Sequence, residues 1–165
     1  MKLYFLRHGE AVSANGVTIR TDAERPLTKE GIDILKIQGK AFAKLNILPD
    51  IIWTSPLVRA KQTAEVVAKQ LDIEDRIVET PKLACGAGLD SIREIIDTKP
   101  HIQSAMFVGH EPDFSTIIGK LIARSGAIVE MKKGGIALIE TEFPLEAGAA
   151  VLMWLLTPKI ILKLD

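Results

Sequence analysis

Charged side chains follow two apolar runs of this sequence at the point where each run ends. Arg7 and His8 come directly after residues 3–6, and His110 follows residues 105–108 with one glycine between them. In an open parallel sheet, ligands bind beyond the carboxyl ends of the strands. If both runs are strands of one sheet, these three side chains lie at the same edge and form a candidate site.

Arg59 adds a second arginine to this candidate site. It follows the apolar run 51–53 and the pair Ser55-Pro56, which is typical of a helix that begins with a capping serine and a proline in its first turn. A cation at that end of a helix is mildly unfavourable, because the helix dipole is positive there. Arg59 and the helix end therefore point to a shared anion, and phosphate is one that helix N-termini bind.

Other motifs that handle phosphate are missing from the sequence. There is no G-x-x-x-x-G-K-[ST] loop, and Cys85 has no arginine at the spacing that a cysteine phosphatase loop requires. No dense group of aspartates suggests a two-magnesium site. A neutral imidazole can itself attack phosphorus and form a covalent phosphoenzyme, while arginines neutralise the phosphoryl oxygens. The residues thus favour phosphoryl transfer through a histidine.

The elements that would position these residues alternate between strands and helices. The expected strands are short apolar runs, at 3–6, 51–53, 105–108, 136–139 and 149–156. Runs of this kind suit strands that are covered on both faces. Helical patterns lie between most of them, which predicts an α/β fold, with a mainly parallel sheet flanked by helices in a single three-layer domain. No clear helix separates the last two runs, so we expect an antiparallel pair there.

Helix signals support the same order of elements. Thr28 is placed to cap a helix that ends before Pro49, and a shorter helix is expected over residues 89–96. Asp113 is placed to cap the helix that follows His110. Residues 72–88 are the least regular segment of the chain.

Length and composition place limits on the function. The 165 residues correspond to one domain, residues 1–165. Lysine plus arginine number 21 and aspartate plus glutamate number 21, so bulk charge gives no reason to expect nucleic acid as a partner. No apolar run approaches the about 18 residues of a membrane span, and no signal-peptide core is present. The single cysteine excludes an internal disulfide, and we expect a cytoplasmic protein.

The motifs taken together resemble one family. Residues 7–10 (R-H-G-E), residues 55–64 (S-P-L-V-R-A-K-Q-T-A) and residues 109–110 (G-H) resemble the histidine phosphatase superfamily, also called the phosphoglycerate mutase-like group. The small size, residues 25–28 (R-P-L-T) and residues 85–86 (C-G) further resemble its SixA-type phosphohistidine phosphatase branch. An R-H-G triplet alone is weak evidence, but its combination with the other two motifs is specific.

This resemblance implies a phosphoglycerate mutase-like fold and a role for each matched residue. His8 would be the phosphorylated nucleophile, and Arg7 and Arg59 would hold the phosphoryl oxygens. His110 would hydrogen-bond the phosphoryl group and stabilise its charge. Arg25 would bind phosphate at the pocket rim or form a structural salt bridge. No metal and no organic cofactor is implied.

A proton donor is missing from the place where larger members of this superfamily carry a glutamate. Residues 82–88, between the arginine helix and the second histidine, contain no carboxylate, and Glu10 is expected to orient an arginine instead. An alkoxide leaving group needs a proton in the transition state. An imidazole leaving group does not, because its conjugate acid has an ordinary pKa of about 6.5. The missing acid therefore favours phosphohistidine over alkyl phosphates.

The preferred hypothesis is a metal-independent phosphatase that acts through a phosphohistidine enzyme intermediate on protein phosphohistidine. The short chain lacks room for the segments that cap the pocket in larger relatives, so we expect an open, shallow site. The partner would be a phosphorylated protein, such as a histidine phosphotransfer domain, and the enzyme would act as a monomer. Two alternatives are a phosphatase for small phosphate esters and a non-catalytic phosphate-binding module, which would leave an aryl phosphate unhydrolysed.

Overall fold

The computed structural model describes residues 1–13 and 21–163. These residues form a six-stranded sheet in the order β3-β2-β4-β1-β5-β6. The strands are β1 (Lys2–Arg7), β2 (Ile51–Thr54), β3 (Ile77–Glu79), β4 (Ser104–Gly109), β5 (Ile136–Glu140) and β6 (Val151–Leu156). The first four strands are parallel, whereas β5 is antiparallel to β1 and β6 is antiparallel to β5. The predicted parallel sheet with an antiparallel pair at the end of the chain is therefore confirmed.

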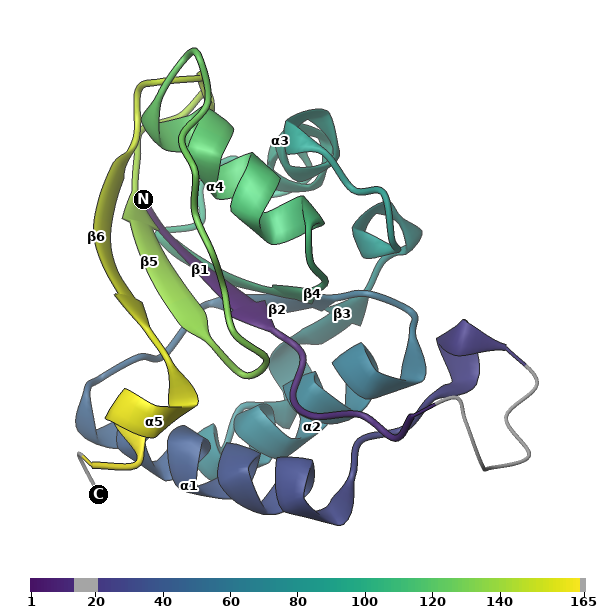
Figure 1. Ribbon diagram of the computed structural model, residues 1–165. Helices are drawn as coiled ribbons and strands as arrows, with labels where there is room; N and C mark the ends of the chain where they lie inside the picture. The colour runs from purple at the N-terminus through teal and green to yellow at the C-terminus, as the bar shows by residue number, and fades with distance from the viewer. Residues whose placement is uncertain (14–20, 164–165) are drawn as a thin grey trace.

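Helices cover both faces of this sheet (Figure 1). On one face lie α1 (Lys29–Lys44), α2 (Val58–Leu71) and the short α5 (Pro158–Ile161), and on the other lie α3 (Leu89–Asp97) and α4 (Asp113–Ile122). Strand side chains alternate between the two resulting cores. Phe5 and Phe107 pack with α3 and α4, whereas Leu6 and Val108 pack with α1 and α2. Because both faces are covered, β1 and β4 are almost entirely apolar, as the sequence predicts.

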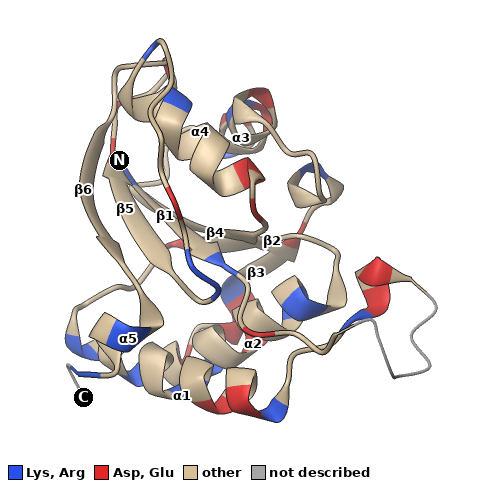
Figure 2. Ribbon diagram, in the orientation of Figure 1, with Lys and Arg blue, Asp and Glu red and all other residues tan. Residues whose placement is uncertain are grey.

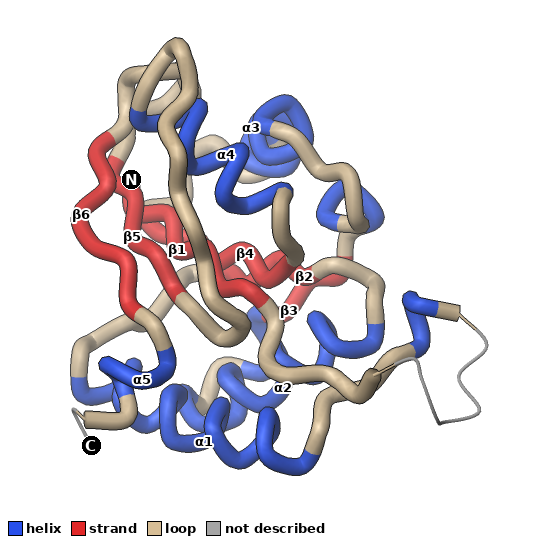
Figure 3. Tube along the Cα trace, viewed as in Figure 1, coloured by secondary structure: helices blue, strands red, loops and turns tan. Residues whose placement is uncertain are grey.

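The carboxyl end of β1 is fixed on both sides by neighbouring backbone. The N–H of His8 donates to the Gly109 carbonyl at 3.0 Å, which continues the pairing with β4. On the other side, the N–H of Arg7 donates to the Gly135 carbonyl, and the N–H of Gly134 donates to the His8 carbonyl, both at 3.0 Å. The loop between α4 and β5 runs the length of the sheet to reach this point (Figure 3). Two segments that are distant in sequence, the end of β4 and the turn before β5, thus set the backbone around His8.

The two edge strands differ from the sequence-based expectation. β3 lies within the segment 72–88, which shows no regular pattern, and its residues are half-buried or exposed. β6 is expected to be covered on both faces, but Val151 is 59% exposed and Met153 is 49% exposed. The apolar run of β6 therefore does not mean that both faces of this edge strand are buried.

The start of α2 also differs from expectation. The helix begins at Val58, not at Pro56, and Leu57 occupies the N-cap position without a side-chain capping bond. The Ser55 hydroxyl oxygen accepts the N–H of Leu57 at 3.3 Å, so Ser55 closes the turn that leads into the helix.

Asp113 does not cap α4 but begins it. The capping bond comes from Glu111, whose carboxylate accepts the N–H of Ser115 at 3.1 Å. The Asp113 carboxylate instead accepts the N–H groups of Gly86 and Ala87 at 2.8 and 3.2 Å. Asp113 therefore ties the loop before α3 to the start of α4.

A close approach at Gly31 holds α1 against the loop that follows β1. Thr28 is the N-cap, as predicted, and its hydroxyl oxygen accepts the N–H of Gly31 at 2.9 Å. A Cβ atom on Gly31 would lie 2.5 Å from the carbonyl oxygen of Glu10. Because the obstructing atom belongs to the backbone, it can move only together with the loop that carries His8.

We expect Gly31→Ala to destabilise the fold by about 1–3 kcal/mol, because the backbone must shift to admit the methyl group. Urea unfolding followed by circular dichroism measures this change. Asp33→Ala, at an exposed position on the same helix, is the control. It should change the free energy of unfolding by no more than about 0.5 kcal/mol. Equal stability of the two variants would show that α1 and the loop are not in close contact in solution.

Candidate active site

The imidazole of His8 has a hydrogen-bond partner at each ring nitrogen. Its Nδ1 lies 2.8 Å from the carbonyl oxygen of Gly9, which can only accept, so Nδ1 carries the proton. Nε2 is then the unprotonated nitrogen, and the Arg59 Nε–H donates to it at 3.2 Å. The backbone carbonyl fixes the tautomer that leaves a lone pair on Nε2. A nucleophilic imidazole needs this tautomer.

Burial keeps the His8 ring neutral. The residue is 7% exposed, and this burial is the main reason why the pKa of His8 falls from its ordinary 6.5 to about 4. The hydrogen bond to Gly9 opposes this fall, whereas the positive charges of Arg59 and Arg7 add to it. At neutral pH the ring is therefore uncharged, and the two nearby arginines help to keep it so.

His110 reaches the same place from the end of β4. The ring centroids of His8 and His110 are 5.3 Å apart, and burial is the main cause that lowers the pKa of His110 to about 3. His110 Nε2 lies 2.7 Å from the Ser55 hydroxyl. The Ser55 oxygen accepts the N–H of Leu57, and its own proton has no other acceptor within the described residues, so we assign that proton to the bond with Nε2. His110 Nδ1 then carries a proton.

Two buried nitrogen atoms that point to a ligand lie in this site. His110 Nδ1 and Arg7 Nε are buried and have no hydrogen-bond partner within residues 1–13 and 21–163. Arg7 also donates from Nη1 to the Met131 carbonyl at 2.6 Å, which holds its guanidinium in place. Since buried polar groups are rarely left without a partner, these donors indicate a ligand that accepts hydrogen bonds.

Thr63 ties α2 to the loop after β1. The N–H of Gly9 donates to the Thr63 hydroxyl oxygen at 3.1 Å, and the Thr63 hydroxyl donates to the Arg59 carbonyl at 2.7 Å. This pair of bonds sets the position of the Arg59 backbone relative to His8. The short distance between Arg59 Nε and His8 Nε2 follows from it.

Asp22 lies in the site although the sequence does not single it out. It begins the single turn η1 (Asp22–Glu24), and its carboxylate bridges two arginines. One oxygen accepts from Arg59 Nη2 at 3.0 Å and the other accepts from Arg25 Nε at 2.7 Å. Burial pushes the pKa of Asp22 upward, but the hydrogen bond to Arg25 and the charge of Arg59 outweigh it and hold this pKa below its usual value.

The site is more enclosed than the sequence suggests. We expect an open, shallow site, yet Arg59 is 3% exposed and His110 is 2% exposed. Asp22 covers Arg59, because its backbone carbonyl also accepts from Arg59 Nη1 at 2.8 Å. The signal that could have indicated Asp22 is its spacing from Arg25, since side chains three residues apart meet within a helical turn.

Arg25 and Glu10 have partners of their own at the rim. Arg25 donates to Asp22 and, from Nη1, to the Val12 carbonyl at 3.1 Å. Glu10 pairs with Lys133 at 2.7 Å, and no hydrogen bond or ion pair joins it to an arginine within the described residues, so the expectation that it orients one has no support there. Lys133 lies in the turn before β5, and Figure 2 shows the cluster of positive residues that this turn brings to the end of β1.

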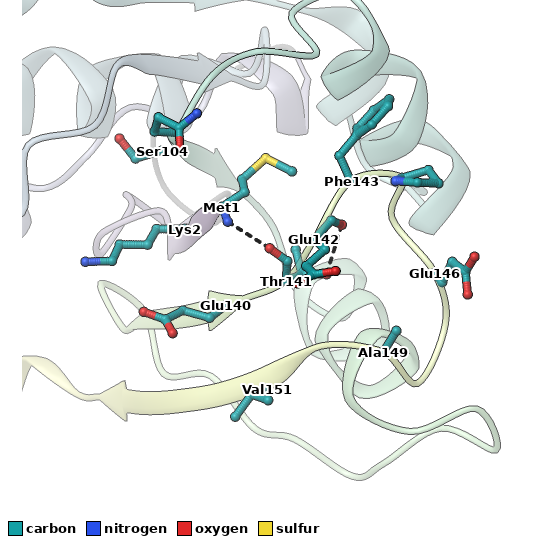
Figure 4. A pocket seen from close by; sticks show the side chains of 12 residues that line it. Met1, Lys2, Ser104, Glu140, Thr141, Glu142, Phe143, Glu146, Ala149 and Val151 are labelled. Carbon is teal, nitrogen blue, oxygen red and sulfur yellow. Dashed lines mark hydrogen bonds between the residues drawn. The ribbon is translucent and has the colours of Figure 1, made fainter.

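A pocket at the opposite end of the sheet contains none of these side chains. It is lined by residues that include Met1, Lys2, Glu140 and Thr141 (Figure 4). β1 runs from Lys2 to Arg7, so the length of this strand separates the pocket from the histidines. The candidate site is therefore defined by its hydrogen bonds and its buried donors.

Metal-ligand clusters and membrane-spanning helices are both absent from the described residues, 1–13 and 21–163. No group of three or more His, Cys, Asp or Glu side chains among them is arranged to hold a metal ion. No helix in these ranges has the length and apolar character that crossing a membrane requires. Cys85 is exposed on the loop before α3.

The chain has relatives among known proteins. Residues 3–84 match the sequence profile of the histidine phosphatase superfamily (branch 1). An uncharacterised protein of Picosynechococcus sp. is 32% identical over 140 residues, which cover 82% of each chain. The chain belongs to the histidine phosphatase superfamily. A further relative is the phosphohistidine phosphatase SixA of Escherichia coli, which is 28% identical over 125 residues, or 74% of this chain and 73% of that protein.

Solved structures of histidine phosphatases share the fold. The protein histidine phosphatase SixA complexed with tungstate gives a TM-score of 0.83 at 20% identity, over 96% of this chain and 98% of that one. A putative phosphohistidine phosphatase SixA from Agrobacterium tumefaciens gives a TM-score of 0.76 at 24% identity, over 95% of this chain and 98% of that one. These structures confirm the predicted phosphoglycerate mutase-like fold. Membership of the superfamily supports a phosphatase.

We expect both site histidines to stay neutral at acidic pH. NMR of protein labelled with ¹⁵N in histidine should show His8 titrating near pH 4 and His110 near pH 3, because burial disfavours the charged rings. Inorganic phosphate should raise both pKa values, since a bound anion stabilises an imidazolium. A midpoint for His8 near 6.5 without phosphate would contradict the buried site.

Ser55 should be needed for the correct tautomer of His110. We expect Ser55→Ala to lower kcat/KM for an aryl phosphate roughly 10–100-fold, as when other hydrogen bonds that orient an imidazole are lost. The same NMR experiment should show both tautomers of His110 in this variant. Ser104→Ala, at the amino end of β4, is the control and should leave both measurements unchanged. Full activity of Ser55→Ala would rule out this role.

Proposed function

We propose that this protein removes phosphoryl groups from phosphohistidine on another protein, through a covalent intermediate on His8. The observation that carries the proposal is the neutral, buried His8, whose unprotonated Nε2 accepts a hydrogen bond from the guanidinium of Arg59. The unpartnered donors of Arg7 and His110 lie in the same site and suit phosphoryl oxygens.

The first step transfers the phosphoryl group to the enzyme. His8 Nε2 attacks phosphorus, the bond from phosphorus to the substrate nitrogen breaks, and the electron pair leaves with the substrate imidazole. Arg59 Nε, which donates to Nε2 in this structure, then donates to a phosphoryl oxygen. Arg7 Nε and His110 Nδ1 donate to the other oxygens and gain the partners that they lack here.

The second step returns the enzyme to its starting state. Water attacks the phosphorus of phosphorylated His8, the bond to Nε2 breaks, and inorganic phosphate leaves. His8 recovers its lone pair while Nδ1 keeps its proton, because the Gly9 carbonyl accepts that proton throughout. We propose that Arg25 contributes its charge at the rim, since its hydrogen bonds go to Asp22 and Val12. No step requires a cofactor.

The carboxylates around the site support a substrate with a weakly basic leaving group. Glu10 is paired with Lys133, and Asp90 is paired with Arg93 at 2.7 Å. Glu111 accepts from Ser115. Each of the three thus has a partner of its own, and the hydrogen bond to Arg25 and the charge of Arg59 hold the pKa of Asp22, the carboxylate within the site, below its usual value. None of these groups is a ready proton donor for an alkoxide. Imidazole needs little such help, because its conjugate acid has an ordinary pKa of about 6.5.

The named relatives agree with this choice of substrate and with an anion site. SixA of Escherichia coli, which shares 28% of its residues over the aligned region, is a phosphohistidine phosphatase. A structure with the same fold holds tungstate, a tetrahedral oxyanion like phosphate. We propose that the partner here is likewise a phosphorylated protein, and that the enzyme meets it as a monomer.

The experiment compares substrates of rising leaving-group basicity. We expect kcat/KM to be highest for a phosphohistidine protein, much lower for aryl phosphates and barely measurable for alkyl phosphates, because no acid is placed to protonate the leaving group. Acid quenching destroys a phosphoimidazole, so the intermediate should be trapped in base and mapped to His8 by mass spectrometry. His8→Ala should abolish turnover, and His101→Ala, at the exposed third histidine, should not.

Two results would overturn the proposal. Normal turnover by His8→Ala, or a trapped phosphoryl group on another residue, would show that His8 is not the nucleophile. Efficient hydrolysis of alkyl phosphates would show that an acid reaches the leaving group, and the preference for phosphohistidine would lose its basis.

A further inference from the structure

Asp22 has no role in the two steps above, yet its carboxylate is hydrogen-bonded to Arg59, an arginine that must hold the phosphoryl group. We propose that Asp22 is a specificity-determining residue, whose carboxylate favours the imidazole leaving group of phosphohistidine and disfavours the oxygen leaving groups of phosphate esters. This inference rests on the proposed function and names the residue that selects its substrate class.

A single guanidinium joins Asp22 to the attacking nitrogen. Arg59 donates from Nε to His8 Nε2 at 3.2 Å and from Nη2 to the Asp22 carboxylate at 3.0 Å. The carboxylate therefore lies one guanidinium away from the nucleophile. Arg59 itself is 3% exposed, so through this hydrogen bond Asp22 reaches the enclosed part of the site.

A substrate phosphoryl group must share Arg59 with this carboxylate. Both are anions that accept hydrogen bonds from the Arg59 guanidinium. When the phosphoryl group reaches His8 Nε2, it therefore displaces the Asp22 carboxylate from Arg59 Nη2. Arg25 keeps the displaced carboxylate near the site. It donates to Asp22 at 2.7 Å and is itself fixed by the Val12 carbonyl at 3.1 Å.

The direction of attack places the leaving group on the side of Asp22. Attacking and leaving atoms lie roughly in line through phosphorus, so the leaving group lies on the outward side, away from the buried His8. The Asp22 side chain is 61% exposed and spans from Arg59 to the rim. Its carboxylate can therefore face a group that leaves through the mouth of the site.

Charge decides which leaving group this carboxylate favours. The far nitrogen of a phosphohistidine ring carries a proton when the ring is protonated, and that N–H can donate to a carboxylate. An ester oxygen gains negative charge as it leaves and is repelled. The pKa of Asp22 lies below its usual value, so the group is ionised at neutral pH and acts as an acceptor, not as a proton donor.

The test measures two substrates with one variant. Asp22→Asn removes the charge and keeps the backbone carbonyl that accepts from Arg59. We expect kcat/KM for a phosphohistidine protein to fall roughly 10–100-fold, as when a charged hydrogen-bond partner is lost. For p-nitrophenyl phosphate, kcat/KM should stay the same or rise. Inorganic phosphate should inhibit more strongly, because the Asp22 carboxylate no longer competes with it for Arg59. Asp33→Asn, in an exposed pair with Lys36, is the control.

Each other outcome overturns the proposal. An equal fall for both substrates would make Asp22 a structural support for Arg59, and an equal rise would make it only an internal competitor of phosphate. Asp22→Glu keeps the charge and should retain the preference for phosphohistidine. If Asp22→Asn does not fold, Asp22→Ser gives the same comparison. Failure of the proposed function is separate, since it would appear in the wild type as a missing phosphoenzyme on His8.

Discussion

An imidazole can attack phosphorus only while it is uncharged, and the site meets this requirement by burying His8 beside permanent cations. Burial and the neighbouring arginines both disfavour the protonated ring, and together they lower the pKa of His8 to about 4. The Gly9 carbonyl then decides which nitrogen keeps the remaining proton. Most of the surrounding contacts preserve this arrangement: β4 and the turn before β5 hold the backbone of His8, and Thr63 holds α2, which carries Arg59.

The same burial shields the positive charges of Arg7 and Arg59 from water, so that an anion must balance them. In this structure Asp22 supplies that anion for Arg59, whereas Arg7 Nε and His110 Nδ1 are left without partners. A buried donor without a partner costs free energy, so these two donors favour an acceptor with several oxygens. The low pKa values of the histidines and the affinity that we propose for a phosphoryl group therefore have one cause, namely the removal of water from a cluster of donors.

The sequence predicts the buried strands and the residues at their ends, because a strand covered on both faces leaves an unbroken apolar run and the polar residue after it is easily seen. It does not predict features that depend on distant contacts or partial exposure. β3 is a short edge strand without such a run. Glu10 meets Lys133 across 123 positions and Asp22 meets Arg59 across 37, and neither pair leaves a local pattern. The histidines and arginines of the candidate site could therefore be predicted from the sequence, whereas only the spacing of Asp22 from Arg25, and nothing in its relation to Arg59, indicates the carboxylate that covers the site.

The strand order has a consequence for how this chain folds. β1 and β2 are the first two strands made, but β4 lies between them in the sheet. Neither can pair with the other, so the sheet has no parallel pair that includes β1 until residues 104–109 are available. The segment that matches the superfamily profile, residues 3–84, thus contains His8, the proposed nucleophile, but cannot assemble the sheet around it. During synthesis the apolar β1 must wait for the second half of the chain, and such long-range pairing makes folding slow and dependent on a late-arriving centre strand.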